Sequence, residues 1–310
     1  MSFNSDVKEE LARIPPLCSH CERAVLAALI RIEGTLFISG QGRYRLEVAT
    51  DTPSVARLAW RLLHDDDGYG LRTELTTRRS VLHKTPNYLI DVPAQEGLVE
   101  ALRDMGVLGE GGLQLGVAPE LVAKSCCEAA YLRGAFLGSG FVADPRGDFH
   151  FEITVESEEM ARDLVAIMEG KGIRARYIQR RSAYIVYLKS GEAILEFLAF
   201  AGAHQSALAM ENARVVKSVR NEVNRQTNAE VANQNKAAAA SVDQIYAMRR
   251  VLDAYDAKQL PRALREVIQL RVKYPDATLK ELGEHADPPL SKSAVYHRIR
   301  RIEAMARELS

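Results

Sequence analysis

The stretch Cys126–Val142, CCEAAYLRGAFLGSGFV, has an earlier counterpart in the same chain, Cys21–Leu36, CERAVLAALIRIEGTL. In each copy a cysteine lies five residues before a leucine, and a helical pattern of small residues then runs into a glycine, Gly34 or Gly140. Small side chains let two helices approach closely, and the glycine lets each helix end in a strand. The sequence therefore predicts two equivalent helices in close contact. The residues expected at this contact are Ala27, Ala28, Ile32, Gly134, Ala135 and Gly138.

The two helices resemble the LAGLIDADG motif of homing endonucleases, read here as Leu26–Gly34 and Leu132–Gly140. In that family the acidic residue before the last glycine holds the metal ion used to cut DNA. Glu33 fills this position in the first copy, but Ser139 fills it in the second, and a neutral hydroxyl is a poor ligand for a hard divalent cation. Because a two-metal cut needs acid from both motifs, the resemblance implies the fold without a catalytic residue.

The same order of elements, helix-strand-strand-helix-strand-strand-helix, is predicted in repeats at about residues 20–105 and 120–205. Strands are expected at residues 36–39, 43–50, 71–79, 87–92, 140–143, 149–155, 174–180 and 183–188, and further helices at 52–63, 94–105, 157–169 and 192–201. Glycines between residues 106 and 112 indicate a loose linker, and residues 1–19 an N-terminal helix. The expected fold class is α+β, beginning with a two-repeat LAGLIDADG homing-endonuclease-like domain over residues 20–210.

Composition and charge locate any nucleic-acid contact in the C-terminal third. The chain has 310 residues, of which 47% are hydrophobic and 26% charged, as in ordinary globular proteins. It has no apolar run of about eighteen residues and no signal-peptide core, so we expect a cytoplasmic protein without membrane contact. The formal net charge is zero, but residues 212–310 hold 18 Lys and Arg against 12 Asp and Glu. A basic third behind an acidic body predicts that DNA is held by that third.

Four cysteines precede the two repeat helices, as Cys18-x-x-Cys21 and as the adjacent pair Cys126 and Cys127. If the helices pack side by side and point the same way, their N-terminal ends meet and the four sulfurs could gather. The preferred interpretation is four buried small hydrophobic side chains, with no metal and no cofactor, because adjacent cysteines are an awkward half-site for zinc. Zinc and a redox role are the alternatives, and metal analysis distinguishes them.

Two basic segments outside the C-terminal domain are candidates for a secondary DNA contact. Residues 211–241 predict a helical linker, in which Val215, Val219 and Val223 continue a stripe from the first domain. Arg220 and Arg225 share one face of this helix with three asparagines. In the second repeat, Arg174, Arg176 and Arg180 share one face of a strand by period-two alternation. The alternative for both segments is a solvated surface, or for the helix an interdomain contact.

Residues 242–310 predict an all-α helix-turn-helix domain. The helix Pro261–Val272 is expected to bury Leu264, Val267, Ile268 and Val272. Thr278-x-x-Glu281 is a capping box that opens a short helix, and Ser291 caps a longer helix that runs through Leu309.

The last helix is amphipathic and basic. Val295, Ile299 and Ile302 lie within an arc of about 60° at 100° per residue, which leaves a basic face opposite them. A short capped helix, a turn and a basic amphipathic helix are typical of a helix-turn-helix whose second helix enters the major groove. A helical interaction bundle is the alternative. The predicted DNA-binding residues are Thr278, Lys280, Ser291, Lys292, Ser293, Tyr296, His297, Arg298, Arg300 and Arg301.

These parts together are similar to the WhiA family of bacterial regulators, over nearly the whole chain. The most specific pieces are Arg220–Asn228, Ala232–Lys236, Asp287–Ser293 and His297–Arg301. The resemblance implies a non-enzymatic regulator that binds double-stranded DNA at promoters in the nucleoid and acts in sporulation, cell division and chromosome segregation. It also implies a WhiB-type iron–sulfur regulator and RNA polymerase as partners. The alternatives are a weakly specific nucleoid or division factor and, with less support, an active endonuclease relying on Glu33.

Overall fold

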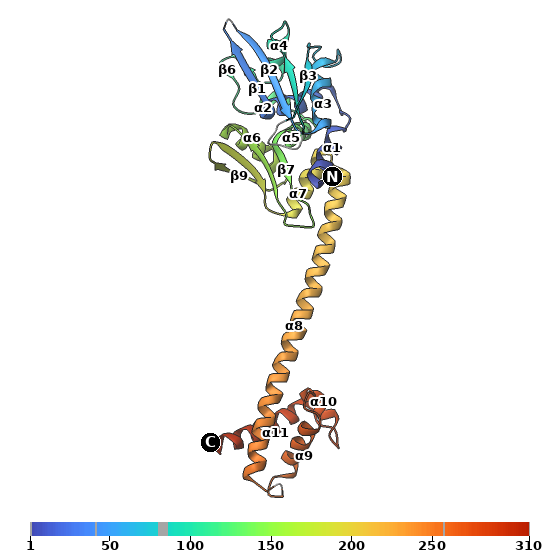
Figure 1. Cartoon of the computed structure of the whole chain (residues 1–310), viewed down its shortest axis with the longest axis vertical. Helices are drawn as coiled ribbons and strands as arrows, with labels where there is room; N and C mark the ends of the chain where they lie inside the picture. Colours follow the sequence, from blue (N-terminus) through green and yellow to red (C-terminus); the bar gives the residue numbers. More distant parts are fainter. Residues whose placement is uncertain (1, 41, 80–85, 257, 310) are drawn as a thin grey trace. The chain divides into compact units, whose positions relative to one another are not determined.

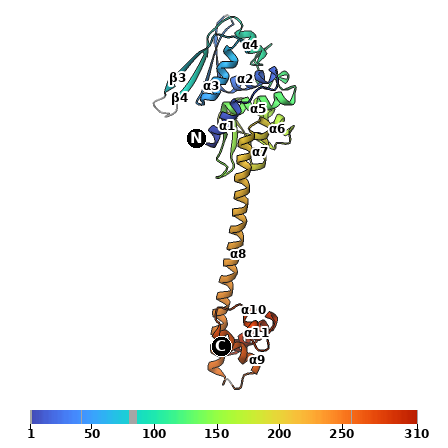
Figure 2. The same cartoon turned by 90° about the vertical axis from the view of Figure 1, so that its right-hand side faces the viewer.

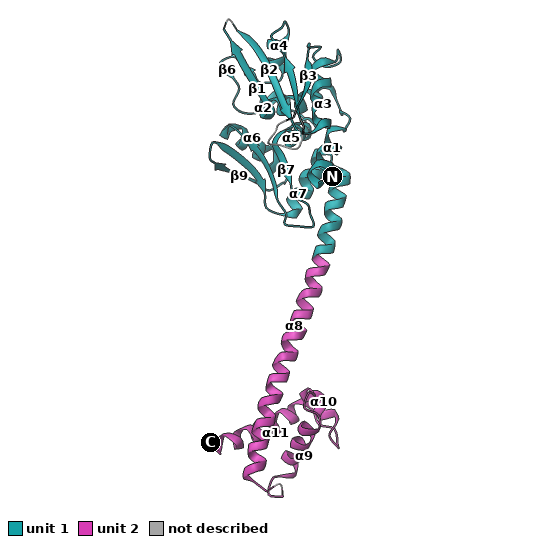
Figure 3. Cartoon of the chain, in the orientation of Figure 1, with its two compact units in different colours: residues 1–217 teal, residues 218–310 magenta. Residues whose placement is uncertain are grey.

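The structure, a computed structural model, describes residues 2–40, 42–79, 86–256 and 258–309 (Figure 1). It contains two compact units, residues 1–217 and residues 218–310 (Figure 3). Each unit has its own core of buried apolar side chains. The first unit is mixed α and β and the second is helical, which agrees with the predicted fold class.

Two helices, α2 (Ser19–Glu33) and α5 (Ser125–Ser139), lie side by side within the first unit (Figures 1 and 2). A Cβ on Gly134 would lie 2.2 Å from the carbonyl oxygen of Val25, and one on Gly138 would lie 3.0 Å from Cγ2 of Ile32. The predicted close approach of small residues is therefore confirmed. Each helix ends at a glycine, because a Cβ on Gly34 or Gly140 would collide with a carbonyl oxygen one turn back.

The glycine at each helix end begins the first strand of a four-stranded antiparallel sheet. The strand orders are β1-β2-β4-β3 and β7-β8-β10-β9, so the two repeats have the same topology. The strands are β1 (Gly34–Ser39), β2 (Arg43–Thr50), β3 (Glu74–Arg79), β4 (Pro86–Val92), β7 (Gly140–Val142), β8 (Phe151–Val155), β9 (Ala175–Arg180) and β10 (Ala183–Leu188). The accompanying helices are α3 (Pro53–His64), α4 (Leu98–Asp104), α6 (Glu158–Glu169) and α7 (Gly191–Ala201).

Two expectations, one for the last helix of the first repeat and one for the segment after it, were wrong. Helix α4 begins at Leu98 rather than at residue 94, because Gly97 has a φ of 83°, which a helix interior does not allow. The expected loose linker holds a small hairpin, β5 (Leu108–Gly109) and β6 (Gly112–Leu113), and the 3₁₀ turn η1 (Pro119–Val122). The guanidinium of Arg31 also holds this segment, since it donates to the carbonyl oxygens of Gln114 and Leu115.

The N-terminal helix α1 (Phe3–Ala12) is part of the first unit. Val7 and Leu11 lie in its core. The carboxylate of Glu10 accepts hydrogen bonds from the backbone N–H groups of Gln205 and Ser206, at 2.8 and 2.9 Å. These N–H groups lie in the first turn of helix α8 (His204–Ala254). N–H groups in the first turn have no acceptor within their own helix and favour a negative charge.

Helix α8 (His204–Ala254) runs without a break for 51 residues through the predicted linker. It contains no glycine or proline and is rich in good helix formers. Every residue from 218 to 240 is exposed, and Val215, Val219 and Val223 are each more than half exposed, so the predicted stripe is not buried against the described residues. None of the helices that the structure describes combines the length and apolar character needed to cross a membrane.

The second unit packs the end of α8 with α9 (Arg262–Lys273), α10 (Leu279–Glu284) and α11 (Lys292–Glu308). Val272 was expected inside but is 58% exposed, and Arg271 is buried in its place. Arg271 follows Leu264 by seven residues, so it lies on the same helical face. Its guanidinium donates to Gln244 Oε1 at 2.9 Å and to the carbonyl oxygens of Pro275 and Ala277, which offsets the burial of its two terminal nitrogens. Its Nε is buried without a hydrogen-bond partner among the described residues.

The contact between α2 and α5 predicts that Gly134→Ala lowers the free energy of unfolding of the first unit. The added methyl group would meet the Val25 carbonyl oxygen at 2.2 Å, and overpacking of this kind costs about 1–3 kcal/mol or more. This exceeds the gain of about 1 kcal/mol in helix propensity. Thermal and urea unfolding would measure the change. Gly147→Ala is the control, because an added Cβ there would lie no closer than 3.5 Å to its nearest neighbour, the Asp144 carbonyl oxygen. Equal stability of Gly134→Ala and the wild type would contradict the close contact.

Candidate nucleic-acid interface

Helices α10 and α11 form the expected helix-turn-helix, and both predicted caps are present. The Thr278 hydroxyl accepts from the Glu281 N–H at 3.3 Å, and the Glu281 carboxylate accepts from the Thr278 N–H at 2.7 Å. The hydrogen bond from the Thr278 N–H, followed by the effect of the Thr278 side chain, lowers the pKa of the Glu281 carboxyl group. The Ser291 hydroxyl accepts from the Ala294 N–H at 3.2 Å and begins α11.

The turn between the two helices depends on a glycine that the sequence reasoning missed. A Cβ on Gly283 would lie 2.2 Å from the carbonyl oxygen of Leu290, and the Leu290 N–H donates to the Gly283 carbonyl oxygen at 2.8 Å. The chain after α10 therefore folds back directly onto that helix. The available signal was a glycine inside a short helical pattern, which often marks a close approach of backbone.

Helix α11 has one buried and one exposed face, as predicted. Val295, Ile299 and Ile302 are at most 2% exposed and lie in the core of the second unit. The opposite face is exposed and has no acidic side chain between residues 291 and 302. Hydroxyl, imidazole, ammonium and guanidinium groups occur together on it, which are donors suited to phosphates and to guanine. The exposed predicted residues of α11 are Lys292, Ser293, Tyr296, His297, Arg300 and Arg301.

Arg298 differs from its neighbours, because it is already paired within the protein. Its guanidinium lies 2.8 Å from a carboxylate oxygen of Glu266 on α9, and only 25% of its side chain is exposed. It also donates to the Ala263 carbonyl oxygen at 3.4 Å. Arg298 therefore ties α11 to α9. The ion pairs of Arg300 with Glu303 and of Lys280 with Glu284 are longer, and their basic side chains are more than half exposed, so both cations are accessible to a phosphate.

The basic strand of the second repeat is exposed, whereas the corresponding sheet of the first repeat carries a row of acidic side chains. Arg174, Arg176 and Arg180 are exposed on and beside β9. On the corresponding sheet of the first repeat, Glu47, Asp91 and Glu74 lie directly opposite one another on β2, β4 and β3. Arg45 lies beside this row and pairs with Asp91 at 2.7 Å and with Glu47. This acidic row comes from strand register, which the sequence did not reveal.

The two candidate arginines of α8 are also accessible. Arg220 and Arg225 are exposed, and Arg225 lies 2.6 Å from the carboxylate of Glu222, one turn away. The asparagines at 221, 224 and 228 are exposed as well. The polar face predicted for this helix is thus solvent-accessible in the second unit.

At the C-terminal ends of α2 and α5, one of the two motif positions keeps its acid, Glu33, and the other is the neutral Ser139. The Ser139 hydroxyl accepts from the Thr154 N–H at 3.0 Å and donates to the carbonyl oxygen of the same residue. The buried ammonium of Lys8, from α1, donates to the Gly138 carbonyl oxygen at 3.0 Å. Burial raises the pKa of Glu33, and the positive charge of Lys8 opposes this rise. Sequence reasoning missed Lys8, since a lysine in an amphipathic helix gives no signal of burial.

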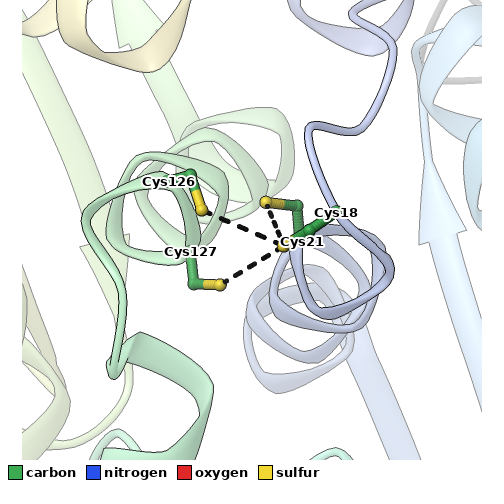
Figure 4. Close-up of side chains that lie close together, drawn as sticks. All are labelled: Cys18, Cys21, Cys126 and Cys127. Atoms are coloured by element: carbon green, nitrogen blue, oxygen red, sulfur yellow. Dashed lines mark hydrogen bonds between the residues drawn. The ribbon is translucent and has the colours of Figure 1, made fainter.

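At the opposite ends of the same helices, the four cysteine sulfurs lie together (Figure 4). The gathering that the spacing allowed is therefore confirmed. A hydrogen bond from Cys21 lowers the pKa of the Cys18 thiol to about 6, whereas burial raises the pKa of Cys21 to about 12 and that of Cys127 to about 11. Among the described residues, these four side chains are the group of His, Cys, Asp or Glu placed to hold a metal ion.

Comparison with known proteins covers both units. The WhiA N-terminal LAGLIDADG-like domain matches residues 19–108, the WhiA LAGLIDADG-like domain matches residues 128–220, and the WhiA C-terminal HTH domain matches residues 223–306. A "Probable cell division protein WhiA" from Heliobacterium modesticaldum is 44% identical over 312 residues, covering 100% of this chain and 97% of the relative. The relative of the same name from Desulforamulus reducens is 42% identical over 313 residues, covering 100% and 96%.

A solved structure has the same fold over the whole length. The crystal structure of full-length DUF199/WhiA from Thermotoga maritima matches with a TM-score of 0.60 at 22% identity, covering 100% of this chain and 99% of that one. At this identity the match supports the fold alone. The family models and the full-length relatives go further, and together they show that this chain belongs to the WhiA family.

Proposed function

We propose that this chain is a non-enzymatic, sequence-specific DNA-binding transcription regulator that acts in cell division, chromosome segregation and sporulation. The observation that carries the proposal is the exposed basic face of α11, held on a helix-turn-helix. Its relatives are named probable cell division proteins, which supports the division role.

The second helix of such a motif lies in the major groove with its N-terminal part toward the bases. On α11 this part carries Lys292 and Ser293 beside unpaired helix N–H groups, which suit a phosphate. Tyr296 and His297 follow one turn later on the exposed face, and Arg300 follows two turns later. Arginine recognises the O6 and N7 acceptors of guanine with two hydrogen bonds, so Arg300 and Arg301 are the candidates for base contacts. Arg298 positions α11 through Glu266.

The proposed loss of nuclease activity is based on the residues at the C-terminal ends of α2 and α5. A divalent cation at this position needs oxygen ligands from both motifs. Ser139 is neutral and bonded to the backbone of β8, and the ammonium of Lys8 supplies a positive charge beside Glu33. A second cation would be repelled there. The first unit therefore acts as a platform rather than as an enzyme.

The platform has two sheets of different charge. The acidic row Glu47, Asp91 and Glu74 would repel phosphates, whereas the arginines of β9 would attract them. Any secondary DNA contact of this unit is therefore proposed for the second sheet. The family resemblance also supports a WhiB-type iron–sulfur regulator and RNA polymerase as partners in the nucleoid, which co-purification with a tagged chain would test.

Removing guanidinium groups from α11 should weaken specific binding. Arg300→Ala and Arg301→Ala are each expected to cost about 1–3 kcal/mol, or roughly 5- to 150-fold in Kd, and to relax the sequence preference at one base pair. Lys292→Ala should weaken binding to all DNA sequences alike and reduce the magnitude of the slope of log K against log salt by about 1. Binding titrations at several salt concentrations measure both effects. Arg249→Ala is the control of equal charge, because the Arg249 side chain is exposed on α8. If this variant weakens binding as much as Arg301→Ala, α11 is not the recognition helix.

Binding to fragmented genomic DNA distinguishes a sequence-specific regulator, an active nuclease and a weakly specific nucleoid factor. The full chain is incubated with the fragments and magnesium, and bound fragments are sequenced with their ends. A regulator should retain intact fragments that share a short motif. New ends shared between fragments and lost in Glu33→Gln would show an active nuclease and overturn the proposal. Intact fragments without a common motif would favour the weakly specific nucleoid factor.

Charge reversal of Arg174, Arg176 and Arg180 together to Glu tests the secondary contact. If β9 holds DNA, the Kd at low salt should rise at least tenfold, because three phosphate attractions become repulsions. Reversal of Arg43 and Arg78, two arginines on the first sheet, is the control and should have little effect. An unchanged Kd in the β9 variant would remove the first unit from the DNA interface and leave the helix-turn-helix proposal intact.

A further inference from the structure

The four cysteines of the chain come from two repeats and meet at one point. Cys18 caps α2 and Cys21 lies in its first turn, whereas Cys126 and Cys127 lie in the first turn of α5. Figure 4 shows the sulfurs of both pairs directed toward each other across the gap between the helices. The Cys18 sulfur lies 3.3 Å from that of Cys21, 3.9 Å from that of Cys126 and 4.0 Å from that of Cys127.

These distances are close to the edges of a zinc tetrathiolate. Zinc binds cysteine sulfur at about 2.3 Å, so the four sulfurs of a regular tetrahedron lie about 3.8 Å apart. All four sulfurs here lie within 4.8 Å of one another, and the three distances from Cys18 lie on either side of the ideal edge. Packing of four small apolar side chains sets no such requirement on their sulfur atoms.

Adjacent cysteines are usable here because of their place in the helix. Cys126 and Cys127 are the second and third residues of α5, before the helix crosses close to α2 at Gly134. Both sulfurs lie toward the Cys18 sulfur of α2, at 3.9 and 4.0 Å (Figure 4). The objection that a Cys-Cys pair makes a poor half-site therefore does not apply to a pair at a helix end.

The surroundings favour a negatively charged centre. A zinc ion with four thiolates has a net charge of −2, and it would lie at the N-terminal ends of two helices, where unpaired N–H groups and the helix dipoles attract anions. Arg133 is 8% exposed and lines the same cavity as Cys21. Among the described residues, no carboxylate forms an ion pair with its guanidinium, which donates to the Ala201 carbonyl oxygen at 2.9 Å. A buried cation of this kind is stabilised by a nearby anionic centre.

We propose that Cys18, Cys21, Cys126 and Cys127 bind one structural zinc ion that joins the N-terminal ends of α2 and α5. This assignment replaces the expectation from spacing that the thiols are metal-free packing groups. Four protein ligands close the coordination shell, so the site leaves no position for substrate and is structural. The sulfurs are too close together to enclose the irons and sulfides of a cluster, and no pair lies at the bonding distance of about 2.05 Å for a disulfide.

The site would join the two repeats at one end, while α1 and Lys8 hold them together at the other. Two ligands come from each repeat, so binding requires the native contact between α2 and α5. Zinc bound to the folded state and not to the unfolded state stabilises the first unit. This inference concerns the first unit and does not depend on DNA recognition by the second.

The test uses the full chain purified without chelators. Elemental analysis should find one zinc per chain, and the thiols should react slowly with a disulfide reagent until a strong chelator is added. After chelation, the midpoint of thermal unfolding should fall by about 5 °C or more. Replacement by cobalt should give an intense near-ultraviolet band from thiolate-to-metal charge transfer and the visible bands of tetrahedral cobalt.

Cys18→Ser combined with Cys21→Ser should reduce the zinc content to background and abolish the cobalt bands, and Cys126→Ser with Cys127→Ser should do the same. His20→Ala is the matched control: it lies between the first two ligands and should retain zinc. Loss of zinc in His20→Ala would overturn the four-thiolate set. Metal-free wild-type chain with four reactive thiols, or with a Cys18–Cys21 disulfide, would overturn the site itself, and iron in place of zinc would overturn the identity of the metal. These outcomes are all read on the wild type or the control, so misfolding of a cysteine variant does not obscure them.

Discussion

The close contact between α2 and α5 is the constraint on which the first unit depends. Gly134 brings the backbone of α5 against Val25 and Ala28 of α2, where a larger side chain has no space. The contact is parallel, because Gly138 meets Ile32 near the C-terminal ends and the cysteines meet at the N-terminal ends. Both sheets begin directly at the glycines that end these helices, so the helix contact also sets where each sheet starts.

The two ends of this helix pair carry different chemistry. At the C-terminal ends, Glu33 keeps the acidic side chain of the first motif, Ser139 takes the equivalent position in the second, and the ammonium of Lys8 donates to the Gly138 carbonyl oxygen. At the N-terminal ends, where the helix dipoles are positive, four sulfurs converge. The central helix pair thus has polar contacts at one end and four converging thiols at the other.

The second unit has a separate core with fewer buried apolar residues. Its short α10 ends in a turn that Gly283 brings against the helix, and its core includes the apolar face of α11. Arg271, Gln244 and the backbone after α9 form a buried polar link between helices. With the apolar face fixed in the core, the basic face of α11 is presented to solvent on a rigid support, as recognition of a groove requires.

Local patterns in the sequence determined most of the secondary structure and the class of both units. Glycine at the ends of the repeat helices, the caps at Thr278 and Ser291, and the period-3.6 stripe of α11 act over a few residues, so they can be recognised in the sequence. The same patterns marked the ten candidate DNA-binding residues, of which only Arg298 has a partner on another helix of the second unit.

Only the tertiary structure decided features that depend on residues far apart in the chain. Lys8 and Gly138 are 130 residues apart, and Cys18 and Cys126 are 108 apart, so no local pattern relates them. The acidic row on the first sheet depends on strand register, and the burial of Arg271 instead of Val272 depends on acceptors from a distant helix. The sequence by itself determined which elements form and which face of α11 is basic. The three-dimensional packing decided which charges and sulfurs meet, because those contacts exist only after the repeats and helices have come together.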